Sequence, residues 1–437
     1  MMGSDKEIRT ERTRPALTTH QIASRLREQM HAFLGNLSAS VPQKTARRFV
    51  CEGLQGILAR KSLRLSEIVR SLNEPIPLIK TENRLSRQAR RGGLADCLHD
   101  FVIRQSAHRI GRDTLLLVDP SDLVKPHAKK MEHLARVRDG SEGGLANGYW
   151  LCQVIAVECG GGHVTPLVNH LWSQDAPGHK SENAEVLSCI ERVTHRVASR
   201  GIWVMDRGGD RMSIMRELLR KHRRFLIRLV GNRHLLYRGK MVLAEDLAHR
   251  CPLPYREAVI KQKRDGTEER LELSFGMMRV RLPGFPKKEL RLVVLHGFGS
   301  GPVMLLTTEA LKPSRRSIQW ALDAYLTRWR IEETLRYAKQ TYGLEDVRVL
   351  SYQGLRNMMA LALLAMSFTM TWLGMRERLI VLMRHALTAA KRFFGVPDFR
   401  YYAISDGLAD ILRRRQTPAF RAPPDLNQGG QLDIIGY

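Results

Sequence analysis

Apolar side chains recur at helical spacing through the first quarter of the chain. The three- and four-residue periodicity is clear in Gln21–Leu34 and Thr45–Leu58, which predicts an amphipathic helix in each. Two shorter helices are expected at Arg64–Leu72 and directly after the turn at Asn73–Pro77. We therefore predict a helical N-terminal region over residues 1–110.

From residue 114 the pattern changes to short apolar runs, which are typical of buried strands. Two of these runs, Thr114–Val118 and Ile202–Met205, are each followed directly by an aspartate. A hairpin, two helices and a further strand are expected around them: Tyr149–Glu158 with His163–Leu171, Asn183–Ser199, Asp210–His222 and Phe225–Val230. Strands that alternate with helices predict an α/β layered domain.

The rhythm changes again between residues 233 and 308, where alternating segments separated by Gly and Pro predict a β-rich insertion. Helices return at Ser314–Thr341 and Tyr352–Lys391. The pattern predicts residues 1–110 as a helical region, 111–232 with 309–395 as the α/β domain, 233–308 as the insertion, and 396–437 as a C-terminal segment with a mobile tail. The nearly apolar stretch Met358–Met375 is interpreted as a buried core helix rather than a membrane span.

The net charge of the chain indicates which kind of partner it binds. The 437 residues include 71 Lys and Arg against 44 Asp and Glu, a formal net charge of +27. Such a surplus favours a polyanion, either nucleic acid or an anionic membrane surface. The first 110 residues carry 20 basic and 10 acidic residues. A DNA-binding helical module and an ordinary solvated surface explain that local surplus equally well.

A second basic segment follows the second apolar run. Arg211–Lys240 holds ten Lys and Arg and a single acid, Glu217. We favour a track for the DNA backbone over an exposed basic helix face. The six cysteines form no C-x-x-C pair and the first residues lack an apolar signal region. These features favour a reducing, cytoplasmic compartment and no membrane partner.

The aspartates that follow the two apolar runs, Asp119 and Asp206, are the first candidates for chemistry. Carboxylates at the ends of adjacent buried strands point into a crevice, where they can bind a hard divalent cation. For either aspartate alone, a turn residue or a helix cap is the more common role. A third acidic group is needed to define a site.

That third group lies in the helix predicted at Ser314–Thr341. At about 100° per residue, Tyr325, Arg328, Glu332 and Lys339 fall on one face only about 60° wide. A solvated stripe with an Arg328–Glu332 pair explains this face as well as a phosphate- and metal-binding site does. Geometry alone leaves the two interpretations open.

The segment YLTRWRIEETLRYAK carries a resemblance to a known family. Its pattern Y-x2-R-x3-E-x6-K, from Tyr325 to Lys339, resembles the YREK signature of bacterial insertion-sequence transposases of the DDE type. VMDRGGD at Val204–Asp210 is similar to the family block at the second catalytic Asp, and LLLVDPSD to the block at the first. A β-rich insertion before the final Glu is also a family trait. The resemblance covers roughly residues 112–375.

The resemblance implies a fold and a reaction. The fold is a ribonuclease-H-like mixed α/β sheet flanked by helices, with the insertion before the last catalytic helix. Asp119, Asp206 and Glu332 are implied to bind two Mg²⁺ ions, with Mn²⁺ as a substitute. The reaction is cleavage of transposon ends and joining of their 3′-hydroxyls to target DNA by metal-dependent phosphoryl transfer.

The resemblance also implies partners. Tyr325, Arg328 and Lys339 would contact phosphates of double-stranded DNA, and Arg207 and Arg330 are predicted as further DNA contacts. The protein would act as a homo-oligomer on paired transposon ends in the bacterial cytoplasm, associated with the nucleoid.

Some features depart from the family or leave rivals open. Some relatives place a Trp in the insertion to receive a flipped base, but this chain has no Trp between Trp203 and Trp320. A hairpin route is therefore not predicted. The rivals are a ribonuclease-H-like nuclease without strand transfer, an inactive DNA-binding derivative and a peripheral membrane protein. Neighbouring acids that could be mistaken for the catalytic ones are Asp122, Asp210 and Glu333.

Overall fold

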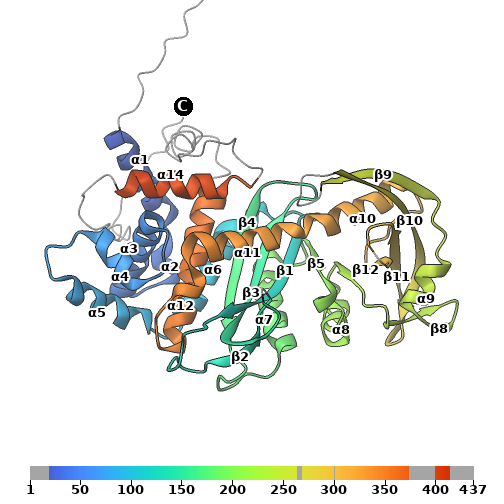
Figure 1. The fold of residues 1–437 in the computed structure, drawn as a ribbon, viewed down its shortest axis with the longest axis horizontal. Coiled ribbons are helices and arrows are strands. Elements are labelled where there is room, and N and C mark those ends of the chain that lie inside the picture. Colours follow the sequence, from blue (N-terminus) through green and yellow to red (C-terminus); the bar gives the residue numbers. More distant parts are fainter. Residues whose placement is uncertain (1–18, 141, 263–267, 300, 374–398, 414–437) are drawn as a thin grey trace, which may run out of the picture.

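The structure is a computed structural model that describes residues 19–140, 142–262, 268–299, 301–373 and 399–413. Within these ranges, a central sheet separates a helical region from a strand-rich extension (Figure 1). The N-terminal helices are α1 (Thr19–Phe33), α2 (Leu37–Ser40), α3 (Lys44–Arg60), α4 (Leu65–Leu72), α5 (Leu78–Ala89) and α6 (Leu94–Ser106). The short paired helices predicted on either side of Asn73–Pro77 are confirmed as α4 and α5.

The described strands form one mixed sheet of 12 strands in the order β2-β3-β1-β5-β6-β12-β11-β10-β7-β8, with β4 paired to β3 and β9 to β10. Only β1, β5 and β6 are mutually parallel; the other pairs are antiparallel. The strands are β1 (Leu115–Val124), β2 (Ala135–Arg138), β3 (Leu145–Val157), β4 (Val164–Trp172), β5 (Ile202–Met205), β6 (Phe225–Arg228), β7 (His234–Tyr237), β8 (Lys240–Leu243), β9 (Tyr255–Gln262), β10 (Glu268–Leu282), β11 (Phe285–His296) and β12 (Val303–Thr307). The predicted mixed sheet flanked by helices is confirmed.

Strand register brings the two candidate aspartates together. Leu117 pairs with Val204 in the parallel β1–β5 ladder, so Asp119 and Asp206 both lie two residues beyond the last paired position. The prediction that Asp119 ends its strand is wrong. β1 continues to Val124 because it pairs with β3 along its whole length. Asp119 instead lies where β1 outlasts its parallel neighbour.

Side-chain alternation decides which face of the sheet these aspartates share. In β1, Leu115 and Leu117 belong to one apolar core, whereas Leu116 and Val118 belong to the other. Because successive side chains of a strand point to opposite faces, Asp119 continues the Leu115 side. The same alternation from Val204 places Asp206 on that side too.

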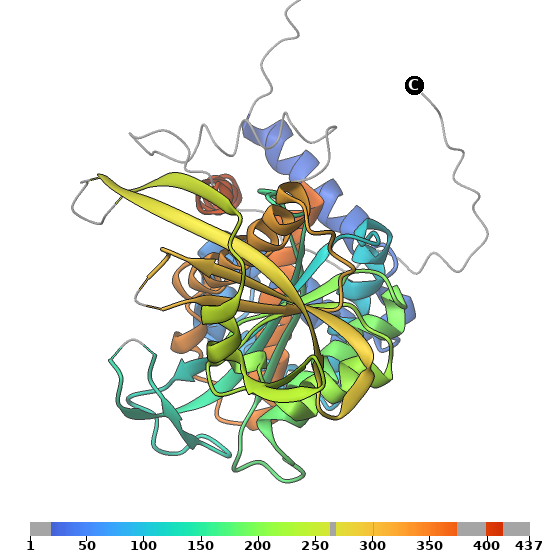
Figure 2. The ribbon, with the colours of Figure 1, turned by 90° about the vertical axis from the view of Figure 1, so that its right-hand side faces the viewer.

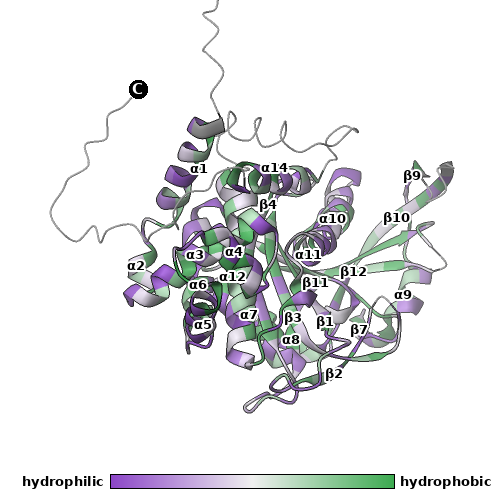
Figure 3. Ribbon diagram, turned by 60° about the vertical axis from the view of Figure 1, so that its left-hand side comes forward, coloured by the Kyte–Doolittle hydropathy of each residue, from purple (hydrophilic) through white to green (hydrophobic). Residues whose placement is uncertain are grey.

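The helices cover both faces of the sheet. α7 (Glu182–Val197) and α8 (Met212–Arg220) pack on the core that contains Leu116. The opposite core is covered by the N-terminal helices together with α10 (Arg315–Thr327), α11 (Trp329–Tyr342) and α12 (Tyr352–Met366). Figure 3 shows apolar colour on the strands and inner helices, and polar colour on the solvent side of α5 and α10. Asp119 and Asp206 therefore face the helix that carries Glu332.

The predicted insertion extends the same sheet. β12 pairs with β6, and β11, β10 and β7 continue outward from it, with the short helix α9 (Ala244–Arg250) alongside. In Figure 2 the long yellow strand β10 crosses the front of the molecule and continues the twist of the sheet. The division of the chain into domains remains a prediction, because the insertion and the central strands share one continuous sheet.

The most apolar helix is buried as predicted. Met358–Met366 lies entirely in the core and is continued by a π-helical turn, Ser367–Leu373. Within the part of the chain that the structure describes, no helix is long and apolar enough to span a bilayer. The rest of the predicted helix to Lys391, and the tail from Gln416, lie outside the described residues.

Two described helices, α9 in the insertion and α14 (Tyr401–Arg413), were not predicted. α14 lies near the end of the chain. It is tied to α3, because Arg413 Nε donates to the Ala59 carbonyl at 2.7 Å and Lys61 pairs with Asp406 at 2.6 Å. The C-terminal part of the chain therefore closes back on the N-terminal helices (Figure 1).

Candidate active site

A break between two helices positions Glu332, the third candidate carboxylate, beside the two aspartates. The single helix predicted at Ser314–Thr341 is divided into α10 and α11 at Arg328, which keeps helical dihedral angles (φ −54°, ψ −29°). The turn is tightened locally, because Ile331 N–H donates to the Arg328 carbonyl at 3.0 Å, three residues back rather than four. Glu332 lies in the first turn of α11.

The Arg328 guanidinium contacts all three candidate carboxylates. Its Nη2 donates to Glu332 Oε1 at 2.7 Å and lies 3.8 Å from Asp206 Oδ2, while Nη1 lies 3.9 Å from Asp119 Oδ2. The structure therefore brings Asp119, Asp206 and Glu332 together around one cation. We refer to these four side chains as the carboxylate cluster.

Tyr325 orients Asp206 at the edge of this cluster. The Tyr325 hydroxyl donates to Asp206 Oδ1 at 3.0 Å and accepts from Arg228 Nη1, also at 3.0 Å. Arg228 itself lies 3.9 Å from Asp206 Oδ1. Burial, and then the negative charge of Asp206, raise the pKa of Tyr325, so its hydroxyl keeps its proton and acts as a donor.

Arg228 was not predicted as a member of the site. It is the last residue of β6, the third parallel strand, next in sheet order after β5. In the sequence Arg228 lies inside the predicted strand Phe225–Val230, whereas in the structure β6 ends at it. The strand-end criterion that identified Asp119 and Asp206 therefore passes over Arg228, which was grouped with the basic track instead.

Electrostatics are unusual at Asp119. Burial raises the pKa of this carboxyl to about 7; Arg328 opposes that shift, while Glu332 and Asp206 add to it. For Arg328, burial lowers the pKa, but Asp206 and Glu332 outweigh it, and the net shift is upward. Three carboxylates around one permanent cation leave a net negative cluster, which suits an additional cation.

The nearby acids serve other contacts. Asp210, whose side chain is 1% exposed, accepts from Val230 N–H and from Arg233 Nε, both at 2.7 Å, and so joins the loops after β5 and β6. The turn that leads to it requires glycine at 209, because a Cβ there would lie 2.5 Å from the Met205 Cβ. The D-R-G-G-D block therefore shapes the loop beside Asp206.

Lys339 and Arg330 point to acids outside the cluster. Lys339 Nζ lies 3.4 Å from Asp122 Oδ2 and 2.9 Å from Glu345 Oε1. Arg330 pairs with Glu333 at 2.8 Å. Arg207, directly after Asp206, is exposed. The structure thus gathers Tyr325 and Arg328 at the carboxylates and leaves the three other predicted DNA contacts around them.

Six of the ten basic residues in the segment Arg211–Lys240 form ion pairs with acids outside the segment. The pairs are Arg211 with Glu182, Lys221 and Arg223 with Glu191, Arg224 with Glu309 and Asp113, Arg228 with Asp206, and Arg233 with Asp210. Exposed members that remain for DNA are Arg216, Arg220, Arg238 and Lys240. The predicted track is therefore narrower than its sequence suggests.

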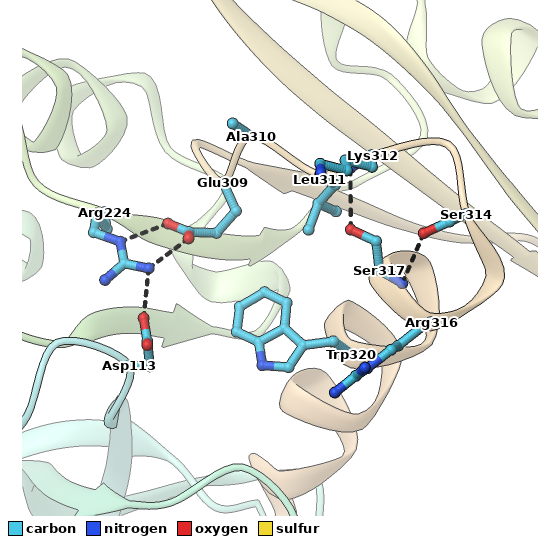
Figure 4. A pocket seen from close by; sticks show the side chains of 10 residues that line it. All are labelled: Asp113, Arg224, Glu309, Ala310, Leu311, Lys312, Ser314, Arg316, Ser317 and Trp320. Carbon is cyan, nitrogen blue, oxygen red and sulfur yellow. Dashed lines mark hydrogen bonds and ion pairs between the residues drawn. The ribbon is translucent and has the colours of Figure 1, made fainter.

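A separate cavity of about 500 Å³ lies at the opposite ends of the parallel strands (Figure 4). Asp113 and Arg224 line it just before β1 and β6 begin, and Glu309 follows β12. Arg224 donates to both Glu309 oxygens, at 2.8 and 2.5 Å, and to Asp113 at 2.9 Å. The Trp320 indole faces this group across the cavity. The carboxylate cluster is not part of its lining.

The three carboxylates fit a divalent cation only if the Arg328 guanidinium moves away from them. Asp119, Asp206 and Glu332 supply the oxygen ligands that hard cations prefer. In the part of the chain that the structure describes, however, no three acidic, His or Cys side chains stand ready as a metal-binding group. The Arg328 guanidinium lies among these carboxylates instead.

The chain matches one family of known proteins. The family described as "Transposase DDE domain" matches residues 111–368, which is more than half of the chain. No curated protein matches the sequence significantly. Among solved structures, the chain is similar to one titled "Cryo-EM structure of piggyBac transposase synaptic complex with hairpin DNA (SNHP)", with 12% identity and a TM-score of 0.42 over 94% of this chain and 84% of that one.

The family match includes Asp119, Asp206 and Glu332, and it spans the strands and helices that position them. The chain belongs to the DDE transposase family. It is a DNA transposase with a ribonuclease-H-like fold, and its family catalyses DNA cleavage and strand transfer. Members of this family generally use divalent metal ions.

Proposed function

We propose that Asp119, Asp206 and Glu332 are the catalytic carboxylates and the ligands of two Mg²⁺ ions, with Mn²⁺ as a substitute. The observation that carries this proposal is the convergence of all three on the Arg328 guanidinium, within 3.9 Å. These residues come from positions 119, 206 and 332, and short loops or local pairing would not bring them together.

When held by Asp119, Asp206 and Glu332, the ions would supply activation of the attacking oxygen and stabilisation of the leaving oxygen. The chain's own residues set the geometry around them. Tyr325 holds one oxygen of Asp206, so that the other oxygen is directed toward the shared centre. Arg228 adds a positive charge on the same side, where a phosphate would approach.

DNA contacts would surround this centre. We propose that Arg207, Arg330 and Lys339 contact the DNA backbone together with Arg328 and Tyr325. Arg207 is exposed beside Asp206, and Lys339 lies two turns along α11 from Glu332. The N-terminal helices and the exposed part of the basic segment would bind more distant duplex, on paired ends bound by a homo-oligomer in the bacterial nucleoid.

The proposal is tested by a pair of neighbouring substitutions. Glu332→Gln and Glu333→Gln remove one charge each from adjacent positions of α11, and of the two only Glu332 contacts the Arg328 guanidinium that the aspartates share. A plasmid carrying the encoding gene with its own flanking DNA serves as substrate. We expect Glu332→Gln to lower end cleavage at least a thousandfold and Glu333→Gln to change it less than threefold. Equal activity of both variants would contradict the assignment.

Products of the same assay separate this function from a simple nuclease. A transposase yields joined donor–target DNA, whereas a nuclease yields only cut ends. Cut ends without joined product in the wild type would contradict strand transfer to target DNA.

A further inference from the structure

We propose that Arg328 and divalent cations compete for the same three carboxylates, and that a cation displaces Arg328 toward the scissile phosphate. This inference rests on the proposed metal-binding role of Asp119, Asp206 and Glu332. It gives Arg328 two successive partners, carboxylate and then phosphate, instead of a single fixed contact.

The Arg328 guanidinium lies among the three carboxylates. One planar group lies 2.7, 3.8 and 3.9 Å from oxygens of Glu332, Asp206 and Asp119 respectively. A cation that bound all three carboxylates would need the region between them, which the guanidinium shares. Two positive centres within a few ångström repel strongly in a partly buried site. Simultaneous occupancy is therefore unfavourable.

Arg328 cannot leave the carboxylates by losing its proton, because a guanidinium stays protonated in proteins. Its side chain is only 5% exposed, so a full positive charge is held among the three carboxylates. A second cation that binds the same three carboxylates would release it.

Arg328 also carries a hydrogen-bond donor that is not used. Arg328 Nε is buried and has no hydrogen-bond partner among the described residues. Nε and Nη2 form one edge of the guanidinium, and only Nη2 on that edge is bonded, to Glu332. A buried donor without a partner is costly, and phosphate oxygens accept from both donors of such an edge. The present contacts therefore leave Arg328 incompletely satisfied.

The path for this displacement is lined by aromatic rings. The Arg328 guanidinium carbon lies 5.7 Å from the centre of the Tyr325 ring and 6.0 Å from that of Trp329. The Trp329 side chain is exposed, whereas Arg328 is buried. A guanidinium that moves outward along Trp329 keeps a favourable cation–π contact. Solvent-exposed Trp329 thus marks the side on which DNA would meet Arg328.

The test measures Mn²⁺ binding to the full-length protein without DNA, by electron paramagnetic resonance titration. Wild type is compared with Arg328→Gln, with Arg330→Gln as a matched loss of charge on the same helix, and with Asp206→Asn. We expect Arg328→Gln to bind Mn²⁺ at least tenfold more tightly than wild type. Arg330→Gln should bind within twofold of wild type.

The outcomes separate this inference from the function on which it rests. Loss of Mn²⁺ binding in Asp206→Asn, combined with unchanged or weaker binding in Arg328→Gln, would overturn the competition alone. Wild-type binding in Asp206→Asn would overturn the metal site itself. Arg328→Lys retains the charge and guards against misfolding of the Gln variant. It should bind Mn²⁺ within threefold of wild type, and a tenfold gain would contradict competition by charge.

Discussion

Two charged clusters lie at opposite ends of the same parallel strands. Before β1 and β6 begin, Arg224 is held by Glu309 and Asp113 through hydrogen bonds of 2.5 to 2.9 Å. Beyond the paired part of β1 and β5, Arg328 makes one short contact and lies 3.8 and 3.9 Å from two more carboxylates. Its Nε has no hydrogen-bond partner in the part of the chain that the structure describes. Similar residue types thus produce a satisfied arrangement at one end and an unsatisfied one at the other.

The difference favours a stabilising role for the first cluster and supports the proposed catalytic role of the second. The ion pairs of Arg224 join β6 to the end of β12 through short hydrogen bonds. The carboxylate cluster carries excess negative charge and an Asp119 pKa of about 7, both of which an incoming cation would relieve. Substitutions in the first cluster should therefore change stability, and substitutions in the second should change activity.

The largest effect on stability is expected from Arg224→Met. This change leaves Glu309, whose side chain is 14% exposed, without its cation. Breaking such a pair should lower the free energy of unfolding by about 3 kcal/mol, measured by denaturant titration. Lys312→Met, at the exposed rim of the same cavity, should cost less than about 0.5 kcal/mol. DNA cleavage per folded molecule should stay within twofold of wild type for both variants. A large loss of activity in Arg224→Met would contradict a purely stabilising role for this cluster.

A smaller effect, on activity, is expected from Tyr325→Phe. The variant loses a hydrogen bond to the charged Asp206 carboxylate, which is worth about 2 kcal/mol, or roughly a thirtyfold lower cleavage rate. The rate is measured in single-turnover cleavage of end DNA. Tyr402→Phe, which loses a hydroxyl bonded to Gln340 at 2.9 Å on the outer surface, should cleave at the wild-type rate. Equal rates for Tyr325→Phe and wild type would show that Asp206 needs no positioning.

The smallest effect is a pH-dependent gain in stability from Asp119→Asn in chelator. The folded pKa of about 7 lies above the ordinary 3.8, so the folded state binds this proton more tightly than the unfolded state does. The stability that the wild type derives from this proton is full below about pH 4 and is lost as pH rises through 7. A shift of this size corresponds to about 4 kcal/mol, which solvent screening at the partly exposed side chain reduces to about 1 kcal/mol. Asn cannot ionise, so the variant should gain about 1 kcal/mol over wild type between pH 4 and pH 8. A constant difference across that range would contradict the raised pKa.

Much of the candidate site follows from the sequence, for identifiable reasons. Short apolar runs before Asp119 and Asp206 specify buried strands, and helical spacing places Glu332 on the face of Tyr325 and Arg328. These signals are local, and the core of the sheet enforces them. The N-terminal helical pairs and the buried helix at Met358–Met366 were predicted by the same periodicity.

The features that the sequence did not predict depend on distant partners. β1 runs past Asp119 because β3 pairs with it, although Pro120, Ser121 and Asp122 interrupt the apolar pattern. The basic segment contributes less to a DNA surface than its charge suggests, because acids as distant as Glu182 and Glu309 pair with it. Arg328 occupies the centre of three carboxylates, which helical spacing alone cannot show.

We propose above that Asp119, Asp206 and Glu332 together bind the catalytic cations. The most direct test is an anomalous diffraction map from crystals of the full-length protein soaked in Mn²⁺. We predict a peak about 2 Å from oxygens of these three side chains, with the Arg328 guanidinium moved away from Glu332. Mn²⁺ bound only elsewhere, such as between Asp122 and Glu345, with Arg328 still on Glu332, would contradict the account.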